Sequence, residues 1–213
     1  MSLRRSLAPA AALLLGLSLA SPVKAAPADA AGFVEGLVHE AISTMENKQE
    51  SQDAQQKKFH DLLVGNFDMP WISHFVLGRY WAPASEEQRQ QFLKLFTDYV
   101  VRSYAQRFSE YSGETVKVTG SRTAGEDTLV RSEIISPKGG DPTKVDWRVR
   151  KEDQGFRIVD VDVEGVSMVV TQRDEFGTVM LHEGGVGGLN KTLEQKLASG
   201  DSSLAAPILP KKQ

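Results

Sequence analysis

The sequence predicts one α+β domain in which helices pack on one face of a curved antiparallel sheet of about four strands. Apolar residues recur with a helical period through the first half of the chain, and the period changes to two after Gly113. Helical signals return near Thr171, and no internal repeat interrupts this order. An order of helices, then consecutive strands, then short helices is typical of an α+β domain rather than of alternating parallel βαβ units.

Three helices are predicted before the long central one. Apolar residues recur at helical spacing from Ala30 to Asn47, and a second helix begins at Gln52 and runs toward Gly65. Asp68 is a good N-cap, and a proline two residues later lies in the first turn, where its missing N–H does no harm. This third helix is short, and we expect it to end near Gly78.

A long helix is predicted from the capping box Ser85-Glu86-Glu87-Gln88 to about Glu110. Its apolar arc is wide and rich in aromatic residues, which indicates that the helix is buried over most of its length. The arc comprises Phe92, Leu95, Phe96, Tyr99, Val100, Tyr104, Phe108 and Tyr111.

Four strands follow, because apolar and polar residues alternate in four consecutive segments. The segments lie around Val116–Val118, Leu129–Ile135, Val145–Val149 and Phe156–Val163. Gly139–Pro142 has strong turn chemistry between the second and third of them. Such a run predicts an antiparallel sheet joined by short turns.

The last part of the domain is predicted to be helical again. Thr171 and Asp174 form a candidate capping pair, Gly184–Gly188 breaks the helix, and a final helix runs from Leu189 to Leu197. The tail from Ser199 to Gln213 is polar and contains proline, which predicts disorder.

The first 25 residues have the layout of a secretory signal peptide. Arg4 and Arg5 precede an apolar stretch from Leu7 to Ala20, and Val23-Lys24-Ala25 follows with small residues at the cleavage positions. We expect cleavage after Ala25 and a mature domain over residues 26–198. The chain has no cysteine, so the sequence predicts neither a lipoprotein anchor nor a disulfide.

The charge of the mature chain argues against nucleic acid as a partner. Removal of Arg4, Arg5 and Lys24 with the signal leaves 22 basic against 28 acidic residues, a formal charge of −6. Binding to nucleic acid or tight adsorption to anionic lipid needs clustered lysine and arginine. Docking on a membrane protein is therefore the more plausible route to a bilayer.

Catalytic and metal-binding patterns are weak. The histidines His39, His60, His74 and His182 lie in separate segments without the spacing of a zinc motif, and we interpret each as a surface or helix-packing residue. Ser167 lies in a segment that lacks the second glycine of a nucleophile elbow. The sequence therefore predicts no enzyme, no metal and no cofactor.

Two further patterns have simpler interpretations than a ligand site. Asp160, Asp162 and Glu164 alternate along a strand, and we favour the solvated face of a half-buried sheet over a cation site because no calcium-binding loop surrounds them. Gly184–Gly188 follows a helix and lacks the Lys-Ser/Thr ending of a phosphate-binding loop, so we favour a hinge.

Two blocks of sequence carry a family resemblance. The first is Phe75–Trp81 together with the aromatic segment Phe92–Tyr111, and the second is Glu164–Met168 followed by Thr171–Phe176. In this order they resemble the MlaC-type periplasmic phospholipid-binding proteins, also called the toluene-tolerance family. The resemblance covers about Phe33 to Leu197.

The resemblance implies an NTF2-like fold with an apolar lipid cavity between sheet and helices. It also implies a periplasmic, non-enzymatic shuttle that carries a phospholipid with two acyl chains between the outer and inner membranes and supports outer-membrane lipid asymmetry. The implied partners are an inner-membrane ABC transporter complex with a substrate-binding ring and an outer-membrane lipoprotein–porin complex. A hopanoid-associated carrier of the same family and a periplasmic enzyme with an NTF2-like pocket remain alternatives.

Residues for the cavity lining are chosen from the apolar faces of the predicted elements, because the family motif does not assign lipid contacts. From periodicity alone a filled core is favoured over a cavity, and the resemblance favours the cavity. The proposed lining is Phe75, Val76, Tyr80, Phe96, Tyr99, Tyr104, Phe108, Trp147, Val149, Val161 and Met168. Arg79, Arg102 and Arg107 are weaker candidates for phosphate contact, and a surface ion pair is favoured for each.

Overall fold

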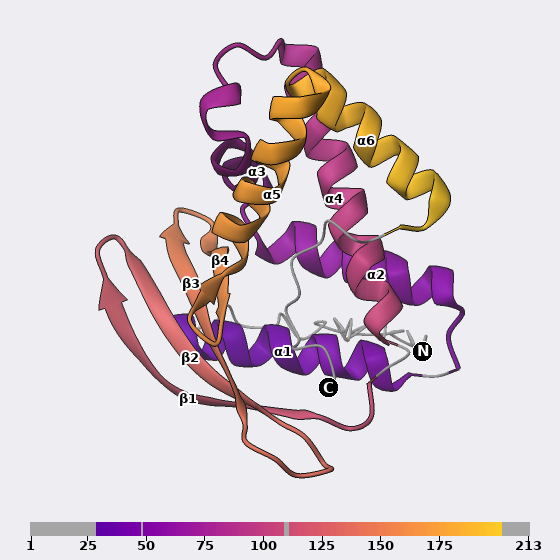
Figure 1. The fold of residues 1–213 in the computed structure, drawn as a ribbon. Coiled ribbons are helices and arrows are strands. Elements are labelled where there is room, and N and C mark those ends of the chain that lie inside the picture. The colour runs from indigo at the N-terminus through magenta and orange to yellow at the C-terminus, as the bar shows by residue number, and fades with distance from the viewer. Residues whose placement is uncertain (1–28, 48, 109–110, 202–213) are drawn as a thin grey trace, which may run out of the picture.

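Six α-helices and a five-stranded antiparallel sheet form the part of the chain that the computed structural model describes, residues 29–47, 49–108 and 111–201 (Figure 1). The helices are α1 (Ala30–Glu46), α2 (Gln52–Asn66), α3 (Met69–Leu77), α4 (Glu86–Phe108), α5 (Met168–Glu183) and α6 (Val186–Ser199), with a 3₁₀ turn η1 (Gly78–Tyr80) after α3. The strands are β1 (Thr115–Ala124), β2 (Asp127–Ile135), β3 (Thr143–Glu152), β4 (Gly155–Val163) and β5 (Val166–Ser167). The predicted α+β class is confirmed.

The helix starts that the sequence predicted from local signals are confirmed. Asp68 accepts a hydrogen bond from the N–H of Trp71 at 3.0 Å and caps α3. Ser85 and Gln88 form the reciprocal capping box of α4, with bonds of 3.0 and 3.2 Å between each backbone N–H and the other side chain. These groups satisfy backbone donors that would otherwise have no partner at a helix start.

The predicted start of α5 is wrong. Thr171 and Asp174 do not cap this helix; Ser167 does, and its Oγ accepts from the N–H of Val170 at 3.1 Å. Asp160 of β4 adds a second acceptor, at 3.2 Å from the N–H of Val169. A carboxylate from a neighbouring strand therefore fixes where α5 begins, and α6 also starts before the predicted Leu189.

The sheet has the order β1-β2-β3-β4-β5, and each strand is antiparallel to its neighbours. The fifth strand, which the sequence analysis did not predict, has two residues and pairs with the end of β4. Register shifts occur at Val118/Gly120 and at Arg148/Val149. Such irregularities bend strands and increase twist, and the sheet curves around α1 (Figure 1).

Helices cover one face of this sheet, as predicted. Helix α1 lies across β1, β2 and β3, whereas α2, α3 and α5 contact β4. Helices α4 and α6 pack against each other and form the side of the helical layer away from the sheet (Figure 1). The opposite face of the sheet carries charged side chains from β2, β3 and β4, including Arg131, Asp146 and Asp160.

The buried apolar side chains form two clusters rather than one. The sheet cluster comprises Ala30, Phe33, Val34, Leu37, Leu62, Val130, Val145, Val149, Ile158, Val161 and Val163. The helical cluster comprises Leu63, Met69, Ile72, Val76, Leu77, Ala84, Phe92, Leu95, Phe96, Tyr99, Val101, Val169, Phe176, Met180, Val186, Leu189 and Leu193. Helix α2 contributes Leu62 to one cluster and Leu63 to the other, so it lies between them.

Two predicted segments lie outside the described residues. They are the signal peptide, residues 1–25, and all but the first three residues of the C-terminal tail. Within the described ranges, none of the helices combines the length and the apolar character that crossing a bilayer requires.

Candidate functional site

The predicted lining residues divide between the two clusters. Phe75, Val76, Tyr80, Phe96 and Tyr99 belong to the helical cluster or pack against it. Trp147, Val149, Val161 and Met168 belong to the sheet cluster or pack against it. Tyr104 lies beside Phe59, with ring centroids 6.3 Å apart, and the side chain of Phe108 lies outside the described residues. The described members of the predicted set are therefore distributed over two clusters and do not form a single lining.

The predicted lining residues differ in how deeply they are buried. Val149 and Val161 are 1% and 3% exposed, and Val76, Phe96 and Tyr99 are also buried. Side chains packed on all sides contribute to an interior of crystal-like density. Trp147 and Met168, in contrast, are half-buried although they pack against the sheet cluster. Only such side chains can contact a ligand without first displacing a neighbour.

Half-buried apolar side chains gather on the inner face of the sheet, on the helix that crosses it and at the start of α5. We call this set the inner apolar surface, and it comprises Val38, Ala41, Val118, Ile134, Trp147 and Met168. Val118, Ile134 and Trp147 come from three adjacent strands, β1, β2 and β3. Val38 and Ala41 come from α1 opposite them. Helix α1 lies across β1, β2 and β3, and the side chains beside it stay half-buried.

Sequence reasoning missed four of these residues. Val38 and Ala41 lie on α1, and Val118 and Ile134 lie on predicted strands, but none was chosen for the lining. Helical spacing could have identified the two residues on α1. Val38 and Ala41 share one broad face of this helix with its buried apolar residues, Phe33, Val34 and Leu37.

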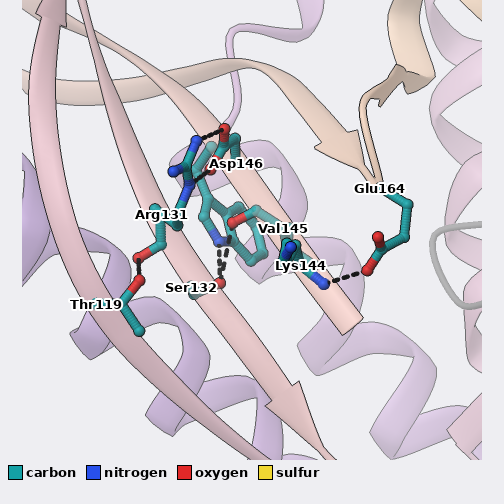
Figure 2. A network of polar contacts seen from close by, with 8 residues as sticks. Thr119, Arg131, Ser132, Lys144, Val145, Asp146 and Glu164 are labelled. Carbon is teal, nitrogen blue, oxygen red and sulfur yellow. Dashed lines mark hydrogen bonds and ion pairs between the residues drawn. The ribbon is translucent and has the colours of Figure 1, made fainter. Parts of the chain in front are cut away.

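A hydrogen bond fixes the indole of Trp147. Its Nε1–H donates to Oγ of Ser132 at 2.9 Å, and the Ser132 hydroxyl lies 3.3 Å from the carbonyl oxygen of Val145, to which it donates (Figure 2). Ser132 is fully buried. A buried hydroxyl and a buried indole N–H each need a partner, and this arrangement supplies both.

The outer face of the sheet carries ion pairs instead. Arg131 donates from Nε and Nη2 to the two carboxylate oxygens of Asp146, both at 2.9 Å (Figure 2). This bidentate pair lowers the pKa of Asp146. Asp162, which faces Asp146 across the ladder, has its pKa raised by burial and by its acidic neighbours Asp146 and Asp160. The charges belong to the solvated side of the sheet.

The three carboxylates at the end of β4 have separate structural partners. Asp160 accepts from the Ser167 hydroxyl at 2.6 Å, and Asp162 accepts from the backbone N–H of Gly165. Oε1 of Glu164 accepts from the backbone N–H of Lys144 (Figure 2). Among the residues that the structure describes, no group of three or more histidine or acidic side chains is placed to hold a metal ion. Ser167 serves as a helix cap bonded to a carboxylate.

The two sequence blocks of the family resemblance meet in space. Gly78, from the first block, lies against the guanidinium of Arg173, from the second. That guanidinium also lies over the ring of Phe75, with Cζ 5.1 Å from the centroid. Phe75 stacks on Trp71 at 5.3 Å, and Arg150 of β3 covers Trp71 at 4.8 Å. These contacts tie the sheet to α3 and α5.

Replacing Gly78 with alanine is expected to lower the free energy of unfolding by about 1–3 kcal/mol, because Gly78 has φ of +50° and ψ of −122°. An added Cβ would also lie 2.9 Å from Nε of Arg173. Urea denaturation measures the effect. Gly36→Ala is the matched control, since nothing lies within 4 Å of an added Cβ there and alanine favours the helix by about 0.5–1 kcal/mol. Equal effects of the two substitutions would contradict this account of Gly78.

Two of the candidate arginines, Arg79 and Arg102, have partners within the described structure. Arg79 donates to the hydroxyl of Tyr80 at 3.0 Å, and Arg102 donates to the carbonyl oxygen of Leu197 near the end of α6. The side chain of Arg107 lies outside the described residues. Arg102 therefore interacts with the C-terminal turn of a helix, where a cation is favourable.

Two hollows on the described surface are lined mainly by polar and charged residues. One of about 310 Å³ lies between α2, α4 and the end of α6, and Asp53, Gln56, Lys57, His60, Asp98, Val101, Arg102 and Leu197 line it. Another of about 220 Å³ lies on the outer face of the sheet, lined by Thr119, Gly120, Ser121, Arg122, Leu129, Arg131 and Asp146. Neither has the apolar lining that a hydrocarbon ligand requires.

Glu175 on α5 is a destabilising group at neutral pH. Its Oε2 is buried and has no hydrogen-bond partner in the described structure, and burial raises the pKa of the carboxyl. Because the folded-state pKa lies above the unfolded value, the ionised form destabilises the fold, and this penalty disappears as the pH falls below the ordinary value of 4.5.

Glu175→Gln is therefore expected to raise the free energy of unfolding near neutral pH, with the gain shrinking to nothing in acid. Urea denaturation of both proteins as a function of pH checks this. The exposed Glu183, on the same helix, provides the control substitution Glu183→Gln, whose effect should stay within about 0.5 kcal/mol. A gain for Glu175→Gln that does not change with pH would refute the burial argument.

Comparisons with known proteins agree with the resemblance. The family model described as MlaC protein matches residues 35–195. The Haemophilus influenzae protein named Intermembrane phospholipid transport system binding protein MlaC is 26% identical over 129 residues, which cover 56% of this chain and 60% of that protein. This chain thus matches about 60% of the length of that curated relative.

A solved structure gives the same assignment. A phospholipid-binding protein from Ralstonia solanacearum, solved in complex with a phospholipid, is similar with a TM-score of 0.72 and 28% sequence identity. The match covers 81% of this chain and 99% of that one. Because the family model matches well over half of its residues, this chain belongs to the MlaC protein family.

Proposed function

We propose that this chain binds a phospholipid, with the acyl chains held between the sheet and the helical layer against the inner apolar surface. The observation that carries the proposal is the set of half-buried apolar side chains on the concave face of the sheet, opposite α1. Membership of the MlaC family and the similarity to a phospholipid-bound structure support it.

Space for the lipid comes from separation of the two apolar clusters. They meet along α2, through Leu62 and Leu63, and at the start of α5, through Met168 and Val169. Elsewhere the sheet cluster packs mainly against α1. A lipid entering between the layers exchanges contacts among half-buried apolar side chains for contacts with hydrocarbon, so the exchange conserves apolar burial.

The energetics suit a carrier. Two acyl chains with about thirty methylenes gain on the order of 24 kcal/mol on transfer from water, at about 0.8 kcal/mol each. Relative to a bilayer, where the chains are already in hydrocarbon, the gain is close to zero. The protein therefore shields its lipid from water without setting a direction, and direction must come from partners.

At the level of the cell, we place this chain in the periplasm as a shuttle between the outer and inner membranes within an Mla-type ABC transport system. The leader-like first 25 residues and the similarity to the Haemophilus influenzae intermembrane phospholipid transport system binding protein MlaC support this placement. The inner-membrane ABC transporter complex with its substrate-binding ring and the outer-membrane lipoprotein–porin complex are the proposed partners. Cargo of the hopanoid class is the alternative, and the mass of the bound lipid distinguishes it.

Native mass spectrometry of the chain without residues 1–25, purified from a bacterial periplasm without detergent, tests the proposal. We expect the folded protein to carry an added mass equal to one phospholipid, which organic solvent releases for identification. Protein that is free of lipid in repeated preparations, and that takes up none from phospholipid vesicles, would refute it. An added mass that matches a polycyclic lipid would replace phospholipid with hopanoid.

A further inference from the structure

A polar pair lies within the apolar inner face of the sheet. Ser132 on β2 is fully buried, and Trp147 on the central strand β3 is half-buried. The indole N–H donates to the serine hydroxyl at 2.9 Å, and the hydroxyl donates to the Val145 carbonyl oxygen (Figure 2). Both donor hydrogens of the pair, the indole N–H and the serine O–H, therefore bond to acceptors within the sheet and not to the helices.

The register of the strands determines how the indole lies. Ser132 is directly opposite Val145, so Trp147 is its diagonal neighbour two residues farther along β3. The Oγ of a serine is only one atom beyond Cβ and lies close to the surface of the sheet. An indole nitrogen 2.9 Å from that atom therefore places the ring along the sheet, leaning toward β2, and not upright in the space below α1.

The hydrogen bond also indicates what covers the ring. In a water-filled groove, water would satisfy the indole N–H, and an internal acceptor would add little. Beneath hydrocarbon there is no such partner, and an unpaired N–H costs about 1–3 kcal/mol. A serine placed among valines to accept this bond is the arrangement that a dry, lipid-covered indole needs.

We infer that Ser132 is a positioning residue for Trp147 and that the indole face forms the floor against which an acyl chain lies. This inference rests on the proposed function and deepens it. Trp147 limits the depth of the acyl compartment, while Ser132 keeps the ring flat by combining a small volume with a hydrogen-bond acceptor. The pair thereby influences which acyl chains fit.

Fluorescence quenching by phospholipid brominated on its acyl chains tests the contact. The protein contains three tryptophans, Trp71, Trp81 and Trp147. Trp71 and Trp81 pack against the helical cluster beneath Arg150 and Arg89, each with its guanidinium carbon 4.8 Å from the ring. We expect loading with brominated lipid to quench the wild-type emission, and Trp147→Phe to remove most of the quenched component. Equal fractional quenching in the two proteins would overturn the inference.

Substitutions of Ser132 test the positioning role. Ser132→Ala keeps the small volume but removes the acceptor, and we expect a shift of the Trp147 emission and an altered length distribution of bound acyl chains. Ser132→Thr retains the hydroxyl and is expected to restore the wild-type emission and distribution. If Ser132→Ala matches the wild type in both measurements, the inference fails. If Ser132→Ala does not fold, the comparison with Trp147→Phe still decides whether the indole contacts the acyl chains, and an unquenched Trp147 would overturn the inference.

Two different results would contradict the proposed function and the inference about Trp147. A wild-type protein that takes up no brominated phospholipid would contradict the proposed function. A protein that takes up the lipid while its Trp147 component stays unquenched would contradict only the inference drawn from Ser132 and Trp147.

Discussion

Replacing Phe176 with alanine is expected to lower the free energy of unfolding by about 3–5 kcal/mol, the range for phenylalanine truncation in a packed core. The side chain is fully buried on α5. Its ring meets Phe92 and Phe96 of α4 edge-on, at centroid distances of 6.0 and 5.7 Å. Removal of the ring leaves a cavity between α4 and α5 and forfeits both aromatic contacts.

Urea denaturation measures this change, and Leu181→Ala is the matched control. Leu181 lies on the same helix but is 64% exposed, so its truncation should change stability by no more than about 0.5 kcal/mol. Similar losses for the two variants would mean that the helical cluster is not packed as described. The amount of lipid bound per folded molecule should be unchanged in Phe176→Ala, because the ring does not face the sheet cluster.

Replacing Ala41 with tryptophan is expected to reduce phospholipid loading by about fiftyfold. Ala41 is half-buried on α1 and packs against the sheet cluster. If the indole displaces about three methylenes from the compartment, each worth about 0.8 kcal/mol, the lost affinity is about 2.4 kcal/mol. The fold should survive because the side chain enters a partly open region and not a filled core.

Ser43→Trp on the exposed side of the same helix is the control, since it adds the same group away from the sheet. Loading is measured as bound phospholipid per protein after incubation with vesicles, with circular dichroism to verify the fold. We expect Ser43→Trp to load like the wild type. Normal loading of Ala41→Trp would exclude the inner apolar surface as the wall of the binding compartment.

Local chemistry explains which elements the sequence predicted. Asp68 and the capping box at Ser85 and Gln88 are signals that act within one turn, so the starts of α3 and α4 follow from sequence alone. The start of α5 depends on Asp160, which reaches it from a neighbouring strand. The short β5 likewise exists only because it pairs with the end of β4.

The candidate site was predicted less completely, for a related reason. Alternation along a strand shows which face a side chain occupies but not how deeply its neighbours cover it. Val149 and Trp147 therefore look equivalent in sequence, although the structure buries the first and leaves the second half-exposed. Coverage depends on the path of α1 over the curved sheet, which a single sequence does not specify.

The central claim is that a phospholipid is held with its acyl chains between the sheet and the helical layer. Anomalous diffraction from crystals of the protein loaded with phospholipid brominated on its acyl chains tests it most directly. The account predicts bromine positions over the inner face of the sheet, near Trp147 and α1. Bromine located only on the charged outer face of the sheet or on the exposed surface of the helical layer would contradict it.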